Sequence, residues 1–441
     1  MKKNLALAAI VALASSSYVE AQNLFSSPPA QHSLPLAIKQ NVKTMAEELI
    51  KKGFTAGDGY GEVWIRDLNT FIELSCKINN RNAIKEHLIT FFQFQQPDGA
   101  ILDGYIPVKK GNVGYQYYKT DLAPEYLGHK NTVETDQETS LVQAVAKYIR
   151  GTGDKTILRD SVAGATVQSQ MERAMDFLMN KRFDNKHGLI WGATTADWGD
   201  VQPEHNWGVV LDEKSHKAID IYDNAMFIIA INDFIEICEL TPAQKIKWRG
   251  IRKNIQKNIK KYLWDTETQK YIPHIYLNGS PFPSSFDESR VYYHGGTAVA
   301  IEAGLLSKKE VLLAYKKMQQ NVIAANASSI GLTLYPVYPE GTFQNEGMRP
   351  YLYQNGGDWT WFGARMVRQL VRYKLINEAE EALRPMLERV IKNHGFYEWY
   401  SPENKPQGSS NFRGEAGVLW SAITALEKNK PKQKTDPHYI K

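Results

Sequence analysis

Hydrophobic residues recur at helical spacing along most of the chain, whereas the two-residue alternation of β-strands is scarce. The apolar density differs between neighbouring segments: residues 219–240 contain the run Ala225 to Ile231, and the following segment, 242–263, is rich in charge. The pattern predicts twelve helices. Their expected ranges are 36–53, 66–79, 81–95, 136–151, 163–182, 219–240, 242–263, 295–304, 307–321, 357–373, 376–393 and 414–428.

The connections between these helices alternate in length. Even-numbered helices are followed by short links, and odd-numbered helices by long segments rich in Gly, Trp, Tyr, Asn, Asp and Pro. Because long irregular loops within one domain usually have a function, six such loops are expected to gather at one end of the molecule. We therefore predict an all-α fold, an (α/α)6 toroid in a single catalytic domain, with the more apolar even-numbered helices inside.

The two ends of the chain have compositions of their own. Lys2 and Lys3 precede a short apolar run from Leu5 to Ala14, which predicts a signal peptide over residues 1–21. The run is too short to span a bilayer. We expect an exported, periplasmic protein without a membrane anchor, with the toroid domain at 22–430 and a flexible tail at 431–441.

Charge and cysteine content exclude several classes of protein. The chain has 53 Lys and Arg against 48 Asp and Glu, a net charge of +5, and the positive residues are spread over expected helix surfaces, so nucleic-acid binding is not indicated. Cys76 and Cys238 are the only cysteines, each within an apolar helical pattern, and they are expected to be buried free thiols. No Cys and His spacing predicts a metal site. We expect a monomer without a cofactor.

The loop from Thr194 to Pro203, near the middle of the chain, carries the most suggestive chemistry. Asp197 and Asp200 lie on either side of Trp198. An acid packed against an indole has its charged form desolvated, which raises its pKa and lets it donate a proton. The alternative is that both aspartates only shape a turn.

Other long loops end in acidic or aromatic residues. Arg66 and Asp67 stand at an expected helix start, where they could bind neighbouring sugar hydroxyls or form an ion pair favoured by the helix dipole. Asp136 is either a ligand of the same kind or a first-turn acid beside the capping-box pair Thr135 and Glu138. Glu398 lies between aromatic residues and is a second carboxylate that could activate water.

Aromatic residues are frequent in these loops, and the chain has ten Trp and 23 Tyr. Their planes suit the C–H faces of sugars, although several could belong to the core. The residues that we expect to line a sugar site are Trp198, Asn355, Trp359, Trp361 and Trp399.

Taken together, the motifs resemble the six-hairpin glycosidases, in particular the glucosidase domain of glycogen debranching enzymes and the processing α-glucosidase family. The matching segments, in chain order, are Trp64-Ile65-Arg66-Asp67, Val133 to Leu141, Asp197-Trp198-Gly199-Asp200, Gln354-Asn355-Gly356 with Trp359 and Trp361, and Tyr397-Glu398 with Gly417 to Ala422. The resemblance implies an inverting enzyme in which Asp200, rather than Asp197, is the general acid and Glu398 is the general base. It also implies that Arg66, Asp67 and Asp136 bind the terminal sugar.

The expected function is therefore exo-acting hydrolysis of terminal α-linked sugars, of the α-glucosidase type, on an oligosaccharide substrate. Three alternatives remain: a glycoside phosphorylase of the same fold, a sugar epimerase or isomerase using His294 or His394, and a non-catalytic sugar-binding protein.

Overall fold

The computed structural model describes residues 34–112 and 116–429. The chain divides into Met1–Ala37 and Ile38–Lys441, and the second unit holds every element below apart from the first two residues of α2. The predicted signal peptide and the predicted tail lie outside the described residues.

The described residues form twelve α-helices, so each predicted helix is present. Their bounds are α2 (Leu36–Ile50), α3 (Ile65–Ile78), α4 (Arg81–Gln93), α5 (Asp136–Thr152), α6 (Val167–Lys181), α7 (Ile221–Ile237), α8 (Pro242–Tyr262), α9 (His294–Glu302), α10 (Lys308–Ala324), α11 (Thr360–Arg372), α12 (Ile376–Asn393) and α13 (Arg413–Asn429). Short 3-10 helices lie at η1 (Val108–Lys110), η2 (Lys155–Arg159), η3 (Glu288–Arg290) and η4 (Glu346–Met348).

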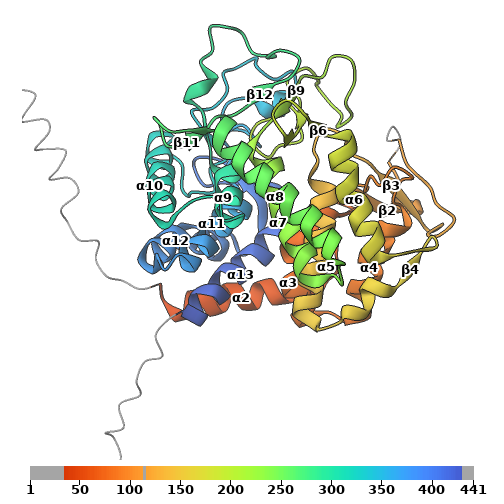
Figure 1. The fold of residues 1–441 in the computed structure, drawn as a ribbon. Helices are drawn as coiled ribbons and strands as arrows, with labels where there is room; N and C mark the ends of the chain where they lie inside the picture. Colours follow the sequence, from red (N-terminus) through yellow and green to blue (C-terminus); the bar gives the residue numbers. More distant parts are fainter. Residues whose placement is uncertain (1–33, 113–115, 430–441) are drawn as a thin grey trace, which may run out of the picture. The chain divides into compact units, whose positions relative to one another are not determined.

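Six of these helices close into an inner ring. Helices α3, α5, α7, α9, α11 and α13 each pack against the next, and α13 packs back against α3. The intervening helices lie outside the ring, as Figure 1 shows for α10 and α12 at its left edge. Inner α7 buries 13 of its 17 residues and outer α8 only 3 of its 21. The prediction of an (α/α)6 toroid with even-numbered helices inside is confirmed.

The predicted helix boundaries differ from the observed ones by a few residues, and the largest difference is at the start of α6. Helix α6 begins at Val167 instead of 163, because Ala163 and Gly164 have φ angles of 51° and 79° and form the turn of a small hairpin. A left-handed backbone cannot continue into an α-helix. The link after α5 is consequently longer than the other links that follow inner helices.

Short strands shape the long loops. Their bounds are β1 (Val63–Trp64), β2 (Gly104–Pro107), β3 (Tyr126–His129), β4 (Ser161–Val162), β5 (Ala165–Thr166), β6 (Phe183–Asp184), β7 (Leu189–Ile190), β8 (Gly192–Ala193), β9 (Lys217–Ile219), β10 (Trp264–Asp265), β11 (Lys270–Tyr271), β12 (Ile275–Tyr276), β13 (Tyr292–Tyr293), β14 (Leu334–Tyr335), β15 (Tyr397–Tyr400) and β16 (Pro406–Ser410). All named pairs are antiparallel, in two three-stranded sheets and five two-stranded pairs. Strands of two to five residues are too short for a two-residue alternation to predict.

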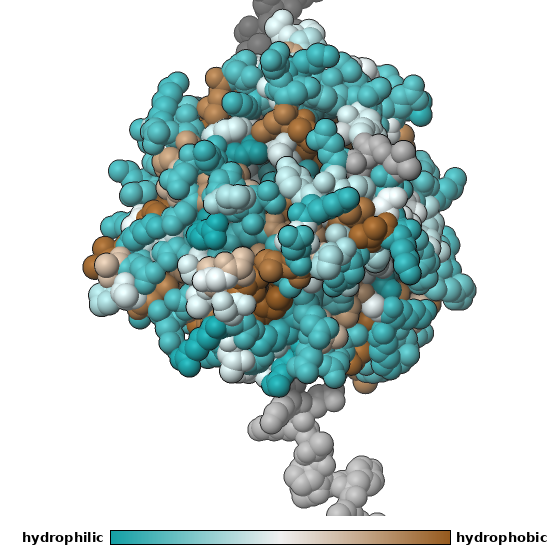
Figure 2. Space-filling model, turned by 90° about the vertical axis from the view of Figure 1, so that its right-hand side faces the viewer, coloured by the Kyte–Doolittle hydropathy of each residue, from teal (hydrophilic) through white to brown (hydrophobic). Residues whose placement is uncertain are grey.

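Surface and cysteine chemistry complete the fold. The face in Figure 2 is mostly hydrophilic, with hydrophobic residues in separate small groups, as is usual for a protein surface. Among the described helices, none is both long and apolar enough to cross a bilayer. Cys76 and Cys238 are free thiols, as predicted; Cys238 is buried, whereas Cys76 is only partly so.

Candidate active site

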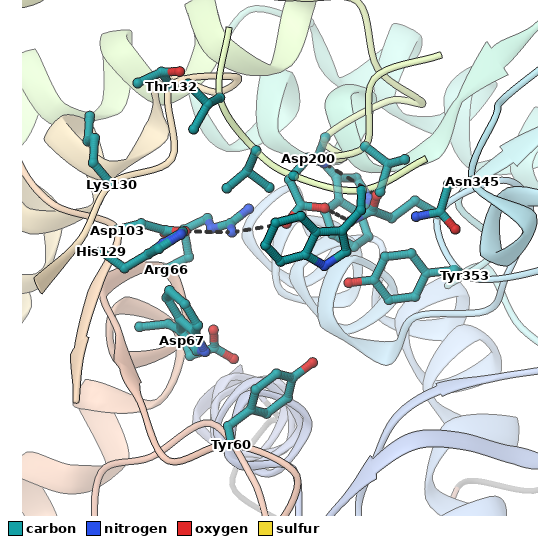
Figure 3. Close-up of a pocket in the computed structure, with 18 of the residues that line it drawn as sticks. Tyr60, Arg66, Asp67, Asp103, His129, Lys130, Thr132, Asp200, Asn345 and Tyr353 are labelled. Carbon is teal, nitrogen blue, oxygen red and sulfur yellow. Dashed lines mark hydrogen bonds and ion pairs between the residues drawn. The ribbon is translucent and has the colours of Figure 1, made fainter. Parts of the chain in front are cut away.

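A cavity of about 680 Å³ opens among the long loops. This volume lies within the range of small-molecule sites in proteins. Its walls come from segments far apart in the sequence, and Figure 3 shows Asp200 across the cavity from Tyr60. Residues that line it include Tyr60, Trp64, Arg66, Asp67, Asp103, His129, Lys130, Trp198, Asp200, Trp207, Asn345, Tyr353, Gln354, Trp359, Trp361, Glu398 and Phe412.

Asp200 enters the cavity from the acid loop, defined as residues 194–203. Its carboxylate Oδ1 accepts a hydrogen bond of 2.9 Å from Gln354 Nε2, and its Oδ2 lies 3.5 Å from Arg66 Nη2. The side chain is 20 % exposed, so it is open to a ligand. The Trp198 indole, which was expected to pack against an acid of this loop, stacks on Phe362.

Asp197 has a different role, although it lies only three residues earlier. Its two carboxylate oxygens accept backbone hydrogen bonds of 2.7 Å from Gly295 and Gly296, at the start of α9. Burial raises its pKa to about 8, and the two N–H donors oppose that rise. Asp197 therefore anchors the acid loop to a helix N-terminus, which is a favourable place for a carboxylate.

Glu398 lies on β15, which pairs with β16; we call residues 397–410 the base hairpin. The Tyr60 hydroxyl donates to Oε1 at 2.8 Å and the Ser409 N–H donates to Oε2 at 2.9 Å. Burial raises the pKa of Glu398, whereas the two donors stabilise the anion and lower it. Gly408 has a φ of 67°, and a Cβ there would lie 2.4 Å from Oε2, so the hairpin needs glycine at this position.

Arg66 lies at the centre of a group of carboxylates. Its guanidinium Nη1 is 2.5 Å from Glu134, and other nitrogens lie 3.5 Å from Asp103 and 3.9 Å from Asp136. With Asp200, four acids surround one cation. The charge of Arg66 is thus already neutralised within the protein, so it holds the site together as well as facing the cavity.

Asp67 and Trp361 both offer a polar atom that has no hydrogen-bond partner among the described residues. These atoms are Asp67 Oδ1 and Trp361 Nε1. Burial raises the pKa of Asp67 to about 8, with the Arg66 charge opposing the rise and nearby Glu398 adding to it. Because buried polar groups are normally paired, an acceptor and a donor left open on one cavity wall fit the hydroxyl groups of a sugar.

Aromatic side chains form one side of the cavity. Trp198 packs edge-on against Trp359, with ring centroids 4.8 Å apart, and Trp361 packs against Phe412 at 6.1 Å. All four rings line the cavity, and three of them, Trp198, Trp359 and Trp361, belong to the residues expected from the sequence. Trp399 does not line it; its ring lies behind, edge-on against Tyr353.

Two further predicted ligands are also set back from the cavity. Asn355 is fully buried: its amide donates to the carbonyls of Tyr338 and Met348 and accepts from the Tyr338 N–H. Its predicted role in substrate binding is corrected to scaffolding, and its neighbour Gln354 reaches the cavity instead. Asp136 is also fully buried and accepts a hydrogen bond of 2.7 Å from the Tyr222 hydroxyl, so it supports Arg66 from behind.

Two further buried acids, and one of the two histidines considered from the sequence, have structural partners. Glu415 accepts hydrogen bonds from Thr360, the Tyr397 N–H and the Tyr400 hydroxyl. Asp220 caps α7 by accepting from the Asp223 N–H. His294 is fully buried against Ile330 and Asn321, and burial lowers its pKa to about 4. His394 has a left-handed backbone and ends α12. Neither histidine lines the cavity.

Sequence reasoning missed several residues of the site. Tyr60, Asp103, Glu134 and Gln354 contact the predicted residues only through the tertiary fold. Only Glu134 and Gln354 could have been found from the sequence, because they lie within motifs that were recognised for other residues. Within residues 34–112 and 116–429, no group of three or more His, Cys, Asp or Glu is arranged to hold a metal ion.

The ring of helices and the acid-lined cavity define a six-hairpin protein of the glycosidase type. The family model of the glycosyl hydrolase 94 superfamily, catalytic domain, matches residues 39–359, and the chain belongs to this superfamily. No curated protein matches the chain significantly.

Solved structures agree on the fold. The GH63 mannosylglycerate hydrolase from Thermus thermophilus, in complex with glucose, superposes with a TM-score of 0.60 at 14 % identity, over 86 % of this chain and 100 % of that one. A rhamnosidase from Klebsiella oxytoca with rhamnose bound gives 0.59 at 12 % identity, over 90 % of this chain and 66 % of the other. The predicted resemblance to six-hairpin glycosidases is thereby confirmed at the level of the fold.

Proposed function

We propose that this protein is an exo-acting, inverting glycoside hydrolase that removes terminal α-linked sugars, of the α-glucosidase type, from oligosaccharides. Asp200 is the general acid that protonates the glycosidic oxygen. Glu398 is the general base that deprotonates the attacking water. Asp67, Arg66 and the Trp359 and Trp361 rings hold the sugar.

The observation that carries this proposal is the pairing of the two carboxylates across one cavity. Glu398 receives the Tyr60 hydroxyl and the Ser409 N–H, both of which favour its anionic form, as a base requires. Asp200 faces the same cavity on the side opposite Tyr60 (Figure 3). Inverting enzymes need room for a water between base and sugar, with carboxyl groups roughly 6.5–9.5 Å apart.

The reaction follows from these positions. A sugar bound with its glycosidic oxygen toward Asp200 receives the proton from this residue as the bond to the leaving group breaks. A water near Glu398 gives up its proton and attacks the anomeric carbon from the opposite face. The anomeric configuration is therefore inverted. Asp200 ends the reaction deprotonated and Glu398 protonated, and exchange of protons with solvent restores the starting states.

A glycoside phosphorylase is the second candidate, since the superfamily includes phosphorylases. The charges of the cavity argue against it. Arg66 is already paired with carboxylates, and Lys130 is bound to Glu138 at 2.9 Å and to Gln137 at 2.6 Å. Five acidic side chains line the same cavity, and no lysine or arginine among the described lining residues is left unpaired to receive an inorganic phosphate. These acids are Asp67, Asp103, Asp200, Asp212 and Glu398.

The test uses proton NMR to determine the anomeric form of the released sugar. It is run on a panel of α- and β-linked disaccharides, with and without phosphate. Release of β-sugar from an α-linked substrate in phosphate-free buffer is expected. Turnover that requires phosphate would replace the hydrolase with the phosphorylase. Binding of sugar without any product would favour a non-catalytic sugar-binding protein.

Export to the periplasm is a separate proposal, supported by the composition of residues 1–21. Mass spectrometry of the protein expressed with its full sequence should find a mature N-terminus at Gln22 in the periplasmic fraction. A retained Met1 in the cytoplasm would contradict it.

A further inference from the structure

Gln354 is in direct contact with the acid, and neither the motifs nor the fold assigns it a role. We propose that Gln354 positions the general acid: it fixes the Asp200 carboxyl so that Oδ2, and not Oδ1, carries the proton that is delivered to the glycosidic oxygen. This inference rests on the proposed function, because it concerns the acid of that reaction.

The contact is reciprocal. The Asp200 backbone N–H donates to Gln354 Oε1 at 3.3 Å, and Gln354 Nε2 donates to Asp200 Oδ1 at 2.9 Å. A backbone N–H can only donate, so the amide oxygen of Gln354 must face it and the amide NH₂ must face Oδ1. The orientation of the amide is therefore determined by chemistry.

This orientation distinguishes the two carboxyl oxygens. The NH₂ group of Gln354 has no acceptor, so Oδ1 must remain an acceptor in both protonation states of Asp200. Oδ2 lies 3.5 Å from Arg66 Nη2, beyond the range of a normal N–H···O hydrogen bond. A carbonyl oxygen accepts more strongly than a hydroxyl oxygen, so this contact favours Oδ1 as the carbonyl oxygen and Oδ2 as the oxygen that holds the proton and turns it toward a ligand.

Gln354 is itself held rigidly. It is 1 % exposed, and it follows Tyr353, whose φ is 46°, and precedes Asn355, whose amide is bound to three backbone groups. On the other side, Gly199 leaves the space that the amide occupies: a Cβ there would lie 2.7 Å from Gln354 Oε1. Gly199, directly before Asp200, and the fixed amide of Gln354 therefore both contribute to the contact between Gln354 and Asp200.

The test compares leaving groups, because only a poor leaving group needs protonation. The value of kcat/KM is measured for an α-glucosyl disaccharide, 4-nitrophenyl α-glucoside and α-glucosyl fluoride with the wild type, Asp200→Asn and Gln354→Met. Gln354→Met keeps the length of the side chain and removes both hydrogen bonds. We expect it to lose about 10- to 100-fold on the disaccharide, a part of what general acid catalysis supplies, and to change little on the fluoride.

Gln202→Met is the matched control. Gln202 is also a buried glutamine of the acid loop, and its amide donates to the Val210 carbonyl, away from Asp200. Its loss, if any, should be the same on all three substrates. Gly199→Ala provides a second variant that displaces the Gln354 amide without altering it, and it should reproduce the leaving-group dependence even if Gln354→Met fails to fold.

The outcomes separate the two proposals. If Asp200→Asn shows the leaving-group dependence but Gln354→Met and Gly199→Ala lose activity equally on all substrates, or lose none, the positioning role is overturned while the hydrolase stands. If Asp200→Asn itself shows no such dependence, the assignment of the acid is overturned and the role of Gln354 with it.

Discussion

The acid loop and the base hairpin bring one carboxylate each to the same cavity, but they are built differently. The base hairpin itself supplies one of the two donors to Glu398, since Ser409, 11 residues away, donates to it, and the other donor is Tyr60. The acid loop depends on distant segments: Asp197 binds Gly295, 98 residues away, and Asp200 binds Gln354, 154 residues away. The position of Glu398 is therefore partly local, whereas the positions of Asp197 and Asp200 depend on segments across the closed ring.

This difference suggests which of the two regions keeps its geometry better when the ring of helices is perturbed. A hairpin that holds its own carboxylate keeps its geometry when the ring loosens slightly. A loop that is held by α9 on one side and by Gln354 on the other moves with either of them. The predictions below test this comparison, from the largest expected effect to the smallest.

Removing either carboxylate should cause the largest loss. Asp200→Asn and Glu398→Gln are each expected to lower kcat on a disaccharide by about 10²- to 10⁴-fold, the usual contribution of a general acid or base. The two variants should differ on α-glucosyl fluoride, where only Glu398→Gln remains impaired because water must still be activated. Circular dichroism and melting curves of both variants are the control for folding. Near-wild-type turnover of either variant would contradict its role.

Asp197→Ala should break the anchoring of the acid loop. It leaves the buried N–H groups of Gly295 and Gly296 without acceptors, which should cost about 1–3 kcal/mol of the free energy of unfolding. Asp200→Ala, whose side chain is 20 % exposed, is the matched control and should cost less. Urea denaturation measures both, and equal losses would mean that Asp197 is not the anchor.

Much of this fold was predictable from the sequence, because helical periodicity is a local signal. Inner α7 and outer α8 differ so strongly in apolar content that their places in the ring follow from their sequences. Arg66, Asp67, Asp200 and Glu398 were found because they lie in motifs of neighbouring residues, and all four line the cavity.

What could not be predicted depends on contacts between distant segments. Asn355 was expected to be an exposed amide that binds sugar. Its side chain instead makes hydrogen bonds to backbone groups of Tyr338 and Met348. Tyr60 is 338 residues from Glu398, so no local pattern relates them. The sequence favoured Asp200 over Asp197 as the general acid only through a resemblance. The geometry supports this choice, because both carboxylate oxygens of Asp197 accept hydrogen bonds from the backbone of α9.

Two buried carboxyls, Asp67 and Glu415, should make the free energy of unfolding depend on pH. Burial raises the pKa of Asp67 to about 8 and that of Glu415 to about 7. Unfolded carboxyls lose their protons near pH 4, so between about pH 6.5 and 8 the folded state binds more protons and its stability should fall as pH rises. Each group contributes at most about 1.4 kcal/mol per pH unit.

Thermal melts of the wild type and Asp67→Asn across this window measure the effect. The melting temperature of the wild type should decrease from about pH 6.5 to 8, and the variant should show a shallower decrease, because an amide does not titrate. A wild-type melting temperature that rises over this range would show that these carboxyls are ionised in the folded protein.

Tyr60→Phe should have the smallest effect and tests how far Glu398 depends on a distant contact. It removes the hydroxyl that donates to Glu398 Oε1 and leaves the Ser409 N–H in place. Because that hydroxyl favours the carboxylate and lowers the pKa of Glu398, its loss should raise this pKa and move the acidic limb of the kcat/KM profile to higher pH, with a loss of only a few-fold at the optimum. Gln354→Met should leave the acidic limb in place, since it acts on the acid. If instead Tyr60→Phe abolished activity at every pH, the base hairpin would depend on distant segments as much as the acid loop does, and the contrast between the two regions would fail.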